Sequence, residues 1–424
     1  MIKKKIKQFL SGKIISAIIT PFLWILPVRL RVKIAGAVNT ARQSYKVKPY
    51  QPGAYPEGVN LFGYLKAQMG LGQGARLMAH AVLESGVPHS LINVSIGNPA
   101  SHNEKEFEAM LSKSPVYNTN IVHINPEQTP LLRLVYPRRT WDKRYNIAVW
   151  LWELEEFPNE WRGEFAYFDE IWTPSAFTSA SIRNSTSLPV ITVPYGIRAE
   201  SDTHFDRDYF QLPKDRFLFL SMYDVNSTME RKNPMGAIDA FCAAFPPDSK
   251  DVGLVVKINN ATPENISELK AYIGSRKNVF VISQLFSKIE VQSLIKACDV
   301  FVSLHRSEGF GLVMAEAMVL GVPSIATNWS ANTDFMKPDV SCLVDYKFID
   351  VKDSYYQQRQ GLRWADPNIE HAAEYMQKLF SDKHYYENIA RAGKAFIQSE
   401  FSTERSAQKI MARLRELDLI KTTL

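Results

Sequence analysis

The amino-acid sequence predicts an α/β protein with two doubly wound parallel-sheet domains that face each other across a cleft. From residue 57 onward, short apolar runs alternate with amphipathic helical patterns, which is typical of parallel strands joined by helices. This alternation stops in a polar stretch without periodicity and then restarts. A chain of 424 residues is also too long for one ordinary core, so two domains are expected.

The first domain is expected over residues 57–198. Six apolar runs are predicted as its strands, at Val59–Tyr64, Ser90–Val94, Asn120–Ile124, Asn146–Trp152, Glu170–Thr173 and Val190–Val193. Helical patterns lie between them, at Gln73–Glu84 and Ala176–Arg183 among others. Residues 199–215 lack a period and are expected to form a linker.

The second domain is expected over residues 216–395. Its strands are predicted at Phe217–Met222, Gly253–Ile258, Val279–Ile282, Val300–Leu304, Ser324–Thr327 and Leu343–Asp345. Helical patterns at Pro234–Ala244 and Lys288–Ala297 separate some of these runs. The last segment, 396–424, is expected to be a helix that returns to the first domain.

Positive charge is concentrated at the N-terminus. Residues 1–48 hold eleven Lys and Arg and no acidic residue, whereas the whole chain has a net charge of +6. Removing those eleven charges leaves −5 for the remainder, which therefore offers no basic excess to neutralise nucleic-acid phosphates. The three cysteines, Cys242, Cys298 and Cys342, form neither a disulfide framework nor a CxxC zinc pattern.

Residues 1–50 are predicted as a basic, apolar, helical segment that associates with an anionic membrane surface. Apolar residues recur at helical spacing among lysines, as in helices that lie in the membrane interface. Three alternatives remain. The first is a membrane-spanning helix over the charge-free run Ile14–Val28. This run would reach roughly 22 Å against ~30 Å of hydrocarbon, and it contains two prolines. A signal peptide and a helix packed on its own protein are the others.

The most informative stretch is Ser307–Met318, which directly follows a predicted strand. A strand, a glycine-rich turn and a helix together form an anion site, because the glycines permit close backbone approach and the helix start supplies free N–H groups. Glu308 in the turn and Glu316 in the helix offer carboxylates that accept hydrogen bonds from sugar hydroxyls. The pattern favours a ligand that contains both phosphate and sugar. The alternative is an ordinary turn with surface glutamates.

This stretch closely resembles the E-x7-E motif of retaining GT-B glycosyltransferases, the glycosyltransferase family 4 or group 1 enzymes, of the type that builds bacterial surface polysaccharides. The resemblance extends to Pro194-Tyr195-Gly196-Ile197, to Thr173–Thr178 and to Trp364–Pro367, and covers roughly residues 57–418. It implies the GT-B fold, with two Rossmann-like domains. It also implies that Glu308 contacts the transferred sugar, that Glu316 holds the nucleotide ribose, and that the donor lies along Gly309, Phe310, Gly311 and Leu312.

A second donor element is Glu230-Arg231-Lys232-Asn233-Pro234, which precedes a predicted helix. Two adjacent cations at a helix start are suited to clamping a diphosphate. Lys232 fits the lysine that the family carries near this helix. The family's preceding Gly-Arg is not matched, because Ser221-Met222-Tyr223 stands there, and Arg231 is the candidate substitute. A solvated charge pair is the alternative.

The first domain contains two further candidates. Gly70, Gly72 and Gly74 precede a helix and permit close backbone approach. Their spacing is not that of a dinucleotide fingerprint, and no Walker lysine follows. The resemblance places this loop at the cleft, beside donor phosphate and acceptor. His123 ends a strand at the sheet edge where α/β proteins bind ligands. The resemblance implies a position near the reacting sugar, and a structural histidine is the alternative.

Glu153 and Glu155 follow the tryptophans of the Trp150–Phe157 stretch. This stretch is either a wall for an acceptor sugar or part of the core. Asp206-Arg207-Asp208 lies in the expected linker with no strand before it, and we interpret it as a solvated loop and not a metal site. The resemblance implies a reaction that requires no metal and no cofactor, with a GDP- or UDP-linked sugar as co-substrate.

Together with these features, the resemblance implies a retaining hexosyltransferase, acting on mannose for example. Its acceptor would be a lipid-linked oligosaccharide or a lipopolysaccharide or capsule precursor. The N-terminal segment predicts a peripheral protein on the cytoplasmic face of the bacterial inner membrane. The alternatives are a membrane-associated nucleotide-sugar-binding subunit without transferase activity, and a sugar-nucleotide epimerase or phosphorylase on the same fold.

Overall fold

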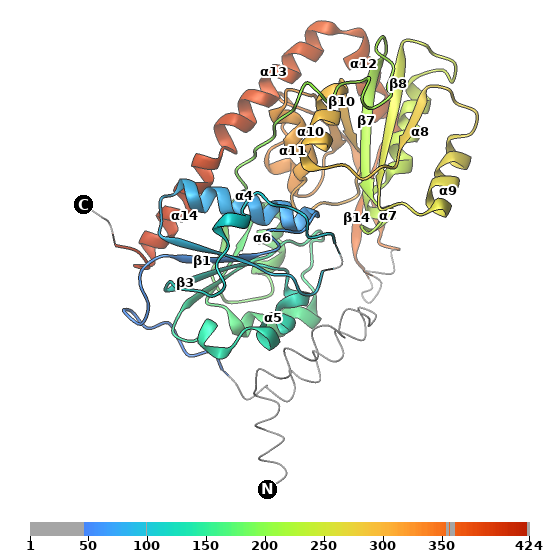
Figure 1. Ribbon diagram of the computed structural model, residues 1–424. Coiled ribbons are helices and arrows are strands. Elements are labelled where there is room, and N and C mark those ends of the chain that lie inside the picture. The colour runs from blue at the N-terminus through green and yellow to red at the C-terminus, as the bar shows by residue number, and fades with distance from the viewer. Residues whose placement is uncertain (1–45, 99, 353–355, 357–360, 422–424) are drawn as a thin grey trace.

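The computed structural model describes residues 46–98, 100–352, 356 and 361–421 (Figure 1). The membrane-associating segment expected at 1–50 therefore lies outside the described residues, apart from its last five positions. Among the described residues, no helix has both the length and the apolar character needed to cross a membrane.

The first domain contains a six-stranded sheet of order β2-β1-β3-β4-β5-β6, in which every neighbouring pair is parallel. Its strands are β1 (Val59–Gly63), β2 (His89–Asn93), β3 (Thr119–His123), β4 (Tyr145–Val149), β5 (Glu170–Thr173) and β6 (Val190–Thr192). Its helices are α4 (Gly70–Glu84), α5 (Thr129–Val135) and α6 (Ala176–Arg183), with 3₁₀ turns at η1 (Glu108–Met110), η2 (Pro126–Gln128), η3 (Arg138–Thr140) and η4 (Asn159–Tyr167).

The second domain contains another six-stranded parallel sheet, of order β12-β11-β10-β7-β8-β9. Its strands are β7 (Phe217–Asp224), β8 (Val252–Asn259), β9 (Val279–Ile282), β10 (Val300–Ser303), β11 (Ser324–Thr327) and β12 (Cys342–Val344). The helices are α7 (Met229–Lys232), α8 (Pro234–Ala244), α9 (Pro263–Ile273), α10 (Lys288–Ala297), α11 (Leu312–Val319) and α12 (Ile369–Ser381), with a 3₁₀ turn at η5 (Ala331–Asp334).

The two-domain α/β architecture predicted from the sequence is confirmed, and each predicted strand is present. The central strands are buried on both faces, which explains their continuous apolar runs. Two details differ from the prediction. The strand expected to reach Trp152 ends at Val149. An antiparallel hairpin that was not predicted, β13 (Tyr346–Asp350) with β14 (Arg363–Pro367), follows β12.

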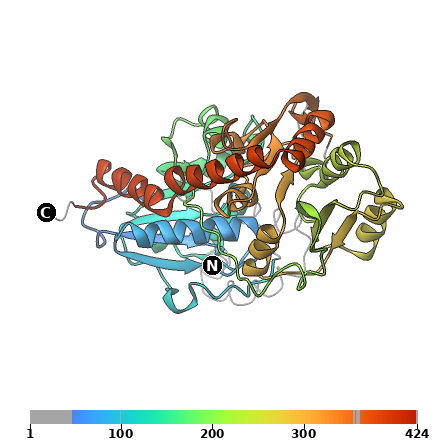
Figure 2. The same ribbon diagram turned by 90° about the horizontal axis from the view of Figure 1, so that it is seen from above.

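The C-terminal helices connect the two domains. Helix α13 (Lys383–Glu400) lies against α11 of the second domain, and α14 (Thr403–Glu416) packs on α4 of the first (Figure 1; Figure 2). The boundary that we place at residue 396 falls inside α13. The Arg413 guanidinium on α14 contacts the fully buried Glu170 carboxylate, with Nη2 and Oε2 separated by 2.6 Å.

Candidate active site

The loop between β10 and α11 places the first glutamate of the motif at the domain interface. Gly311 is the N-cap of α11 and has a φ of 98°, a left-handed conformation that favours glycine. The backbone N–H of Glu308 donates to the Ser330 hydroxyl at 2.9 Å, which fixes the turn. The Glu308 side chain is buried and directed toward α7.

Two cations from α7 hold the Glu308 carboxylate. The Lys232 ammonium forms an ion pair with Oε1, and the Arg231 Nη1 lies 3.3 Å from the same oxygen. Burial by itself would raise the pKa of Glu308, but Lys232, Arg231 and His305 outweigh it and lower that pKa to about 2. The carboxylate is therefore ionised at any physiological pH.

Arg231 connects the motif to the first domain. It is 6% exposed, and its Nη1 donates to the Ser307 carbonyl at 2.9 Å. Its Nη2 lies 3.8 Å from the Glu153 carboxylate of the first domain. Burial opposes its charge, but Glu308 and Glu153 raise its pKa above the ordinary value. The two acids thus compensate the cost of burying a guanidinium.

The first domain also contacts the motif loop through hydrogen bonds. The Ser175 hydroxyl donates to the Gly309 carbonyl at 3.0 Å, and Thr178 donates to the same oxygen at 3.3 Å. Ser307 donates to the Glu153 carbonyl. Phe310 is buried and its ring packs edge-on against Tyr195, with the ring centres 5.1 Å apart. The first domain therefore packs directly against the segment Gly309-Phe310-Gly311.

Glu316 lies in the second turn of α11 and faces two amides. Gln73 from α4 and Gln292 from α10 each donate to its Oε1, at 3.3 and 3.2 Å. Burial raises the pKa of Glu316 to about 7. Gln73 in turn accepts from Arg76 at 3.1 Å, which fixes the orientation of its amide. The second predicted glutamate therefore lies at the same domain interface as the first.

The three glycines expected in a loop lie instead in the first turns of α4, which begins at Gly70. A Cβ at position 72 would stand 2.2 Å from the Ala67 carbonyl oxygen, and one at position 74 would stand 2.6 Å from the Tyr195 hydroxyl. Gly70 has open space around it. Close packing therefore requires glycine at positions 72 and 74 only.

His123 ends β3 and is completely buried. Its Nε2 lies 2.7 Å from the Tyr195 hydroxyl, and its Nδ1 has no partner among the described residues. Burial lowers the pKa of His123 to about 4, so the ring is neutral near pH 7. Because Tyr195 also contacts Phe310, His123 is connected to the motif loop.

Three contributors to this site were not identified as candidates from the sequence. Gln73 lies inside the glycine cluster, and Tyr195 lies inside the Pro194–Ile197 stretch, so both were adjacent to recognisable signals. Gln292 is a polar residue on an amphipathic helix and carries no such signal. Leu312 is the first residue of α11 and packs, half-buried, on the core.

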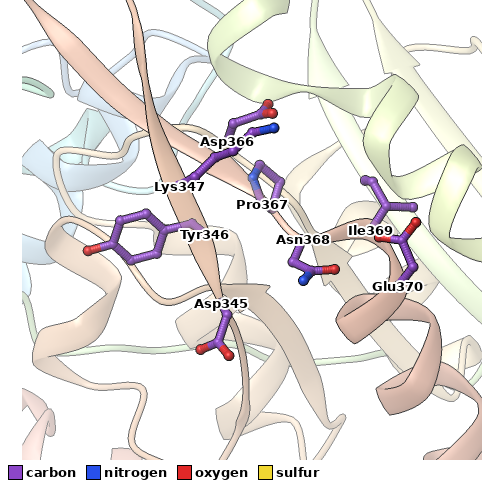
Figure 3. Close-up of a pocket in the computed structure, with 8 residues that line it drawn as sticks. All are labelled: Asp345, Tyr346, Lys347, Asp366, Pro367, Asn368, Ile369 and Glu370. Carbon is purple, nitrogen blue, oxygen red and sulfur yellow. The ribbon is translucent and has the colours of Figure 1, made fainter.

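A separate hollow of about 360 Å³ lies between the β13–β14 hairpin and the start of α12 (Figure 3). Neither Glu308, Lys232 nor Glu316 lines it. The Asp366 carboxylate at its edge is bound by Arg306, with Nη2 at 3.0 Å. Within the described part of the chain, no group of three or more His, Cys, Asp or Glu is arranged to hold a metal ion.

Comparison with known proteins finds one matching family model and several similar solved structures. Residues 202–396 match the family model described as "Glycosyl transferases group 1". Similar solved structures include HepE of Anabaena, at 13% identity and a TM-score of 0.59, covering 85% of this chain and 100% of that one. Another is the sucrose-phosphate synthase of Thermosynechococcus elongatus, at 15% identity and a TM-score of 0.61, covering 88% and 99%.

A third similar structure is a glycosyltransferase from Rickettsia africae, at 13% identity and a TM-score of 0.59, covering 89% of this chain and 100% of that one. At these identities the likeness concerns the fold alone. It extends over both domains, whereas the family model matches the second domain and the linker before it.

Proposed function

We propose that the chain is a group 1 glycosyl transferase, the family whose model matches residues 202–396, and that it is a retaining hexosyltransferase. The observation that carries the proposal is the buried arrangement of Glu308 with Lys232 and Arg231 at the domain interface. A nucleotide sugar would bind in the second domain and the acceptor in the first. The product would be a glycoside with the configuration of the donor.

A nucleotide diphosphate as leaving group is supported by the two cations. Lys232 and Arg231 would stabilise the charge that develops on the departing diphosphate, and the start of α11 would add backbone N–H groups. The HepE structures contain UDP with glucose, or UDP-glucose, which supports a UDP- or GDP-linked hexose as donor. No metal or cofactor is required in this scheme.

The electrostatics of Glu308 support an orienting role. A carboxylate whose pKa is lowered to about 2 is a poor proton acceptor at neutral pH. We therefore assign Glu308 to holding the hydroxyls of the transferred sugar, and we assign the acceptor proton to the leaving phosphate. Glu316 would hold the ribose, and neutral His123 would support the sugar site through Tyr195.

For the acceptor we propose a lipid-linked oligosaccharide or a precursor of lipopolysaccharide or capsule. The support is the concentration of eleven basic residues and no acid in residues 1–48, beside an apolar run. Such a segment would hold the catalyst on the anionic cytoplasmic face of the inner membrane. The proposal for the acceptor is independent of the proposal for the donor site.

The test is sugar transfer by purified protein, with UDP-glucose and GDP-mannose offered to extracted lipid-linked intermediates. We expect Glu308→Gln to reduce transfer about 100-fold or more, as for loss of a preorganised electrostatic contact. Glu387→Gln, at an exposed position on α13, is the control and should retain full activity. Undiminished transfer by Glu308→Gln would reject the assignment, and NMR of the product anomer decides whether configuration is retained.

The competing proposal is a nucleotide-sugar-binding subunit without transferase activity. The feature in its favour is the family's unmatched Gly-Arg, at Ser221-Met222-Tyr223. Arg231 weighs against it, because its buried guanidinium reaches Glu308. A protein that binds nucleotide tightly but neither transfers nor hydrolyses any donor would support the subunit.

A further inference from the structure

Buried polar atoms without partners gather at one edge of the first sheet. At the carboxyl ends of β1, β2 and β3, several side chains besides His123 have a polar atom that is shielded from solvent and has no hydrogen-bond partner among the described residues. These atoms include Tyr64 Oη, Asn98 Nδ2, Glu127 Oε2 and Thr129 Oγ1. Tyr64, Asn98 and Thr129 are each at most 2% exposed.

The amino half of the same sheet behaves differently. Asn60, Asn120 and Asn146 lie side by side on β1, β3 and β4 and are linked by hydrogen bonds of 3.0 and 2.8 Å. Their remaining amide hydrogens reach backbone carbonyls. An unsatisfied buried polar group costs about 1–3 kcal/mol, so several at one edge are a feature that requires an explanation.

The unpartnered atoms are chemically mixed. The Asn98 amide has a fixed orientation, because its Oδ1 accepts from the Ala100 backbone N–H at 2.8 Å, so its Nδ2 is a donor. Tyr64 supplies a hydroxyl and Glu127 a carboxyl oxygen. Burial raises the pKa of Tyr64, and the nearby Glu127 carboxylate raises it further. The two groups thus lie near each other and offer a donor and an acceptor to one ligand.

Two cations near this edge already have partners. Arg76 donates to the carbonyls of Leu65 and Ala67, and Lys66 is paired with Glu108. Burial raises the pKa of Glu127 to about 7, and Glu153 contributes in the same direction. A phosphate would meet this acid without a counter-charge, whereas sugar hydroxyls both donate and accept. This edge therefore offers an acid and neutral polar groups, whereas Lys232 and Arg231 offer positive charge.

We propose that Tyr64, Asn98, Glu127 and Thr129 form the subsite for a neutral, hydroxyl-rich sugar ring of the acceptor, with Tyr64 donating to it and Glu127 accepting from it. The site lies outside residues 202–396, so the family match does not assign it. Its role as an acceptor site rests on the proposed function. Its preference for a neutral sugar over a sugar phosphate rests on these side chains alone.

The test is saturation-transfer NMR of the full chain with excess UDP present. The probes are methyl α-glucopyranoside, methyl α-mannopyranoside and glucose 6-phosphate. We expect at least one neutral glycoside to bind, and Tyr64→Phe and Glu127→Gln each to weaken it about fivefold to tenfold, the effect of one hydrogen bond. The controls are Tyr145→Phe and Asp169→Asn, which make the same changes at the amino edge.

Thermal unfolding separates this role from a structural one. Because the Tyr64 hydroxyl has no protein partner, Tyr64→Phe should leave the melting temperature unchanged or raise it. Equal binding to the variants, no binding of either neutral glycoside, or preference for the phosphate would overturn the subsite. Failure of UDP to bind in parallel calorimetry would instead reject the proposed function, and would leave the sugar subsite standing.

Discussion

At the scale of single residues, the charged groups around Glu308 depend on one another across the domain interface. Glu308 is ionised because Lys232 and Arg231 surround it, and Arg231 is tolerated in the interior because Glu308 and Glu153 compensate it. Glu153 belongs to the first domain, whereas the other three belong to the second. The proposed donor site is thus completed by a carboxylate from the opposite domain.

This dependence predicts the effect of Glu153→Gln. Without the Glu153 charge, Arg231 keeps a single acidic partner among the described residues, Glu308, and its guanidinium is held less firmly. We expect kcat to fall about tenfold, because the lost contact amounts to about 1.4 kcal/mol of transition-state stabilisation. KM for the nucleotide sugar should change less, because Lys232 and Glu316 are untouched.

Glu155→Gln is the matched control for this prediction. Glu155 lies two residues further on and also reaches the second domain, with an oxygen 3.1 Å from Arg363, but that pair is exposed and away from Glu308. Steady-state kinetics of both variants test whether Glu153 specifically positions Arg231. Equal losses in the two would show that the domains are merely held together and that Arg231 is not specifically positioned.

The raised pKa of Glu316 predicts a pH-dependent stability. In the unfolded chain Glu316 ionises near pH 4.5, whereas in the folded protein burial delays ionisation to about pH 7. Between these values the folded state binds more protons, so this group makes stability fall as pH rises from 4.5 to 7, by up to about 3 kcal/mol.

Glu316→Gln tests this dependence, because glutamine does not ionise. Urea unfolding at pH 5 and pH 7.5 should show a smaller difference between the two pH values for the variant than for the unmodified protein. Other buried acids, such as Glu127, contribute in both proteins and cancel in the comparison. An unchanged difference would contradict the assignment of the raised pKa to Glu316.

At the scale of elements, α4 approaches its neighbours so closely that particular positions need glycine. The helix packs under α14 and brings Gln73 to Glu316. A Cβ at Gly74 would meet the Tyr195 hydroxyl at 2.6 Å and His123 Nε2 at 3.1 Å. The start of α4 therefore determines how closely the first domain meets the motif loop.

Alanine substitutions in α4 should separate the effect of close packing on stability from the effect of helix propensity. We expect Gly74→Ala to destabilise the protein by about 1–3 kcal/mol, because overpacking displaces Tyr195 and His123. Gly70→Ala has open space and gains helix propensity, so its stability should be unchanged or higher. Thermal unfolding checks both variants, and equal behaviour of the two would contradict the close approach.

At the scale of the whole molecule, α13 and α14 run along both domains and join them (Figure 2). The buried Glu170 carboxylate accepts from Arg413 on α14, and also from Trp172 Nε1 at 2.6 Å. Ser406 donates to the Pro194 carbonyl at 2.8 Å, where the chain leaves the first domain. The C-terminal helix is thus part of the first domain's core.

Breaking this contact should be costly. Arg413→Met leaves a buried carboxylate without its counter-charge, and we expect a loss of about 3 kcal/mol in the free energy of unfolding. Arg405→Met on the same helix removes an exposed pair with Glu400 and should cost at most about 1 kcal/mol. Chemical denaturation of the two variants provides the comparison, and similar losses would refute the special role of Arg413.

Much of this protein was predictable because its signals are local. Alternating apolar runs indicated every strand of both sheets, since each strand is buried as a unit. Ser307–Met318 indicated the position of Glu308 and Glu316, because a strand, a glycine turn and a helix determine their own geometry. The β13–β14 hairpin was missed because its residues are partly exposed and follow no single period.

The sequence by itself determined the two-sheet architecture and the motif loop, because hydrophobic periodicity and glycine placement act over a few residues. Only the tertiary structure decided which groups meet: Glu153 with Arg231 and Gln73 with Glu316 across the interface, and His123 with Tyr195 within the first domain. These partners are separated by 72 to 243 positions. The pKa values of His123, Arg231 and Glu316 depend on burial, and those of Arg231 and Glu316 also on these partners, which no local pattern records.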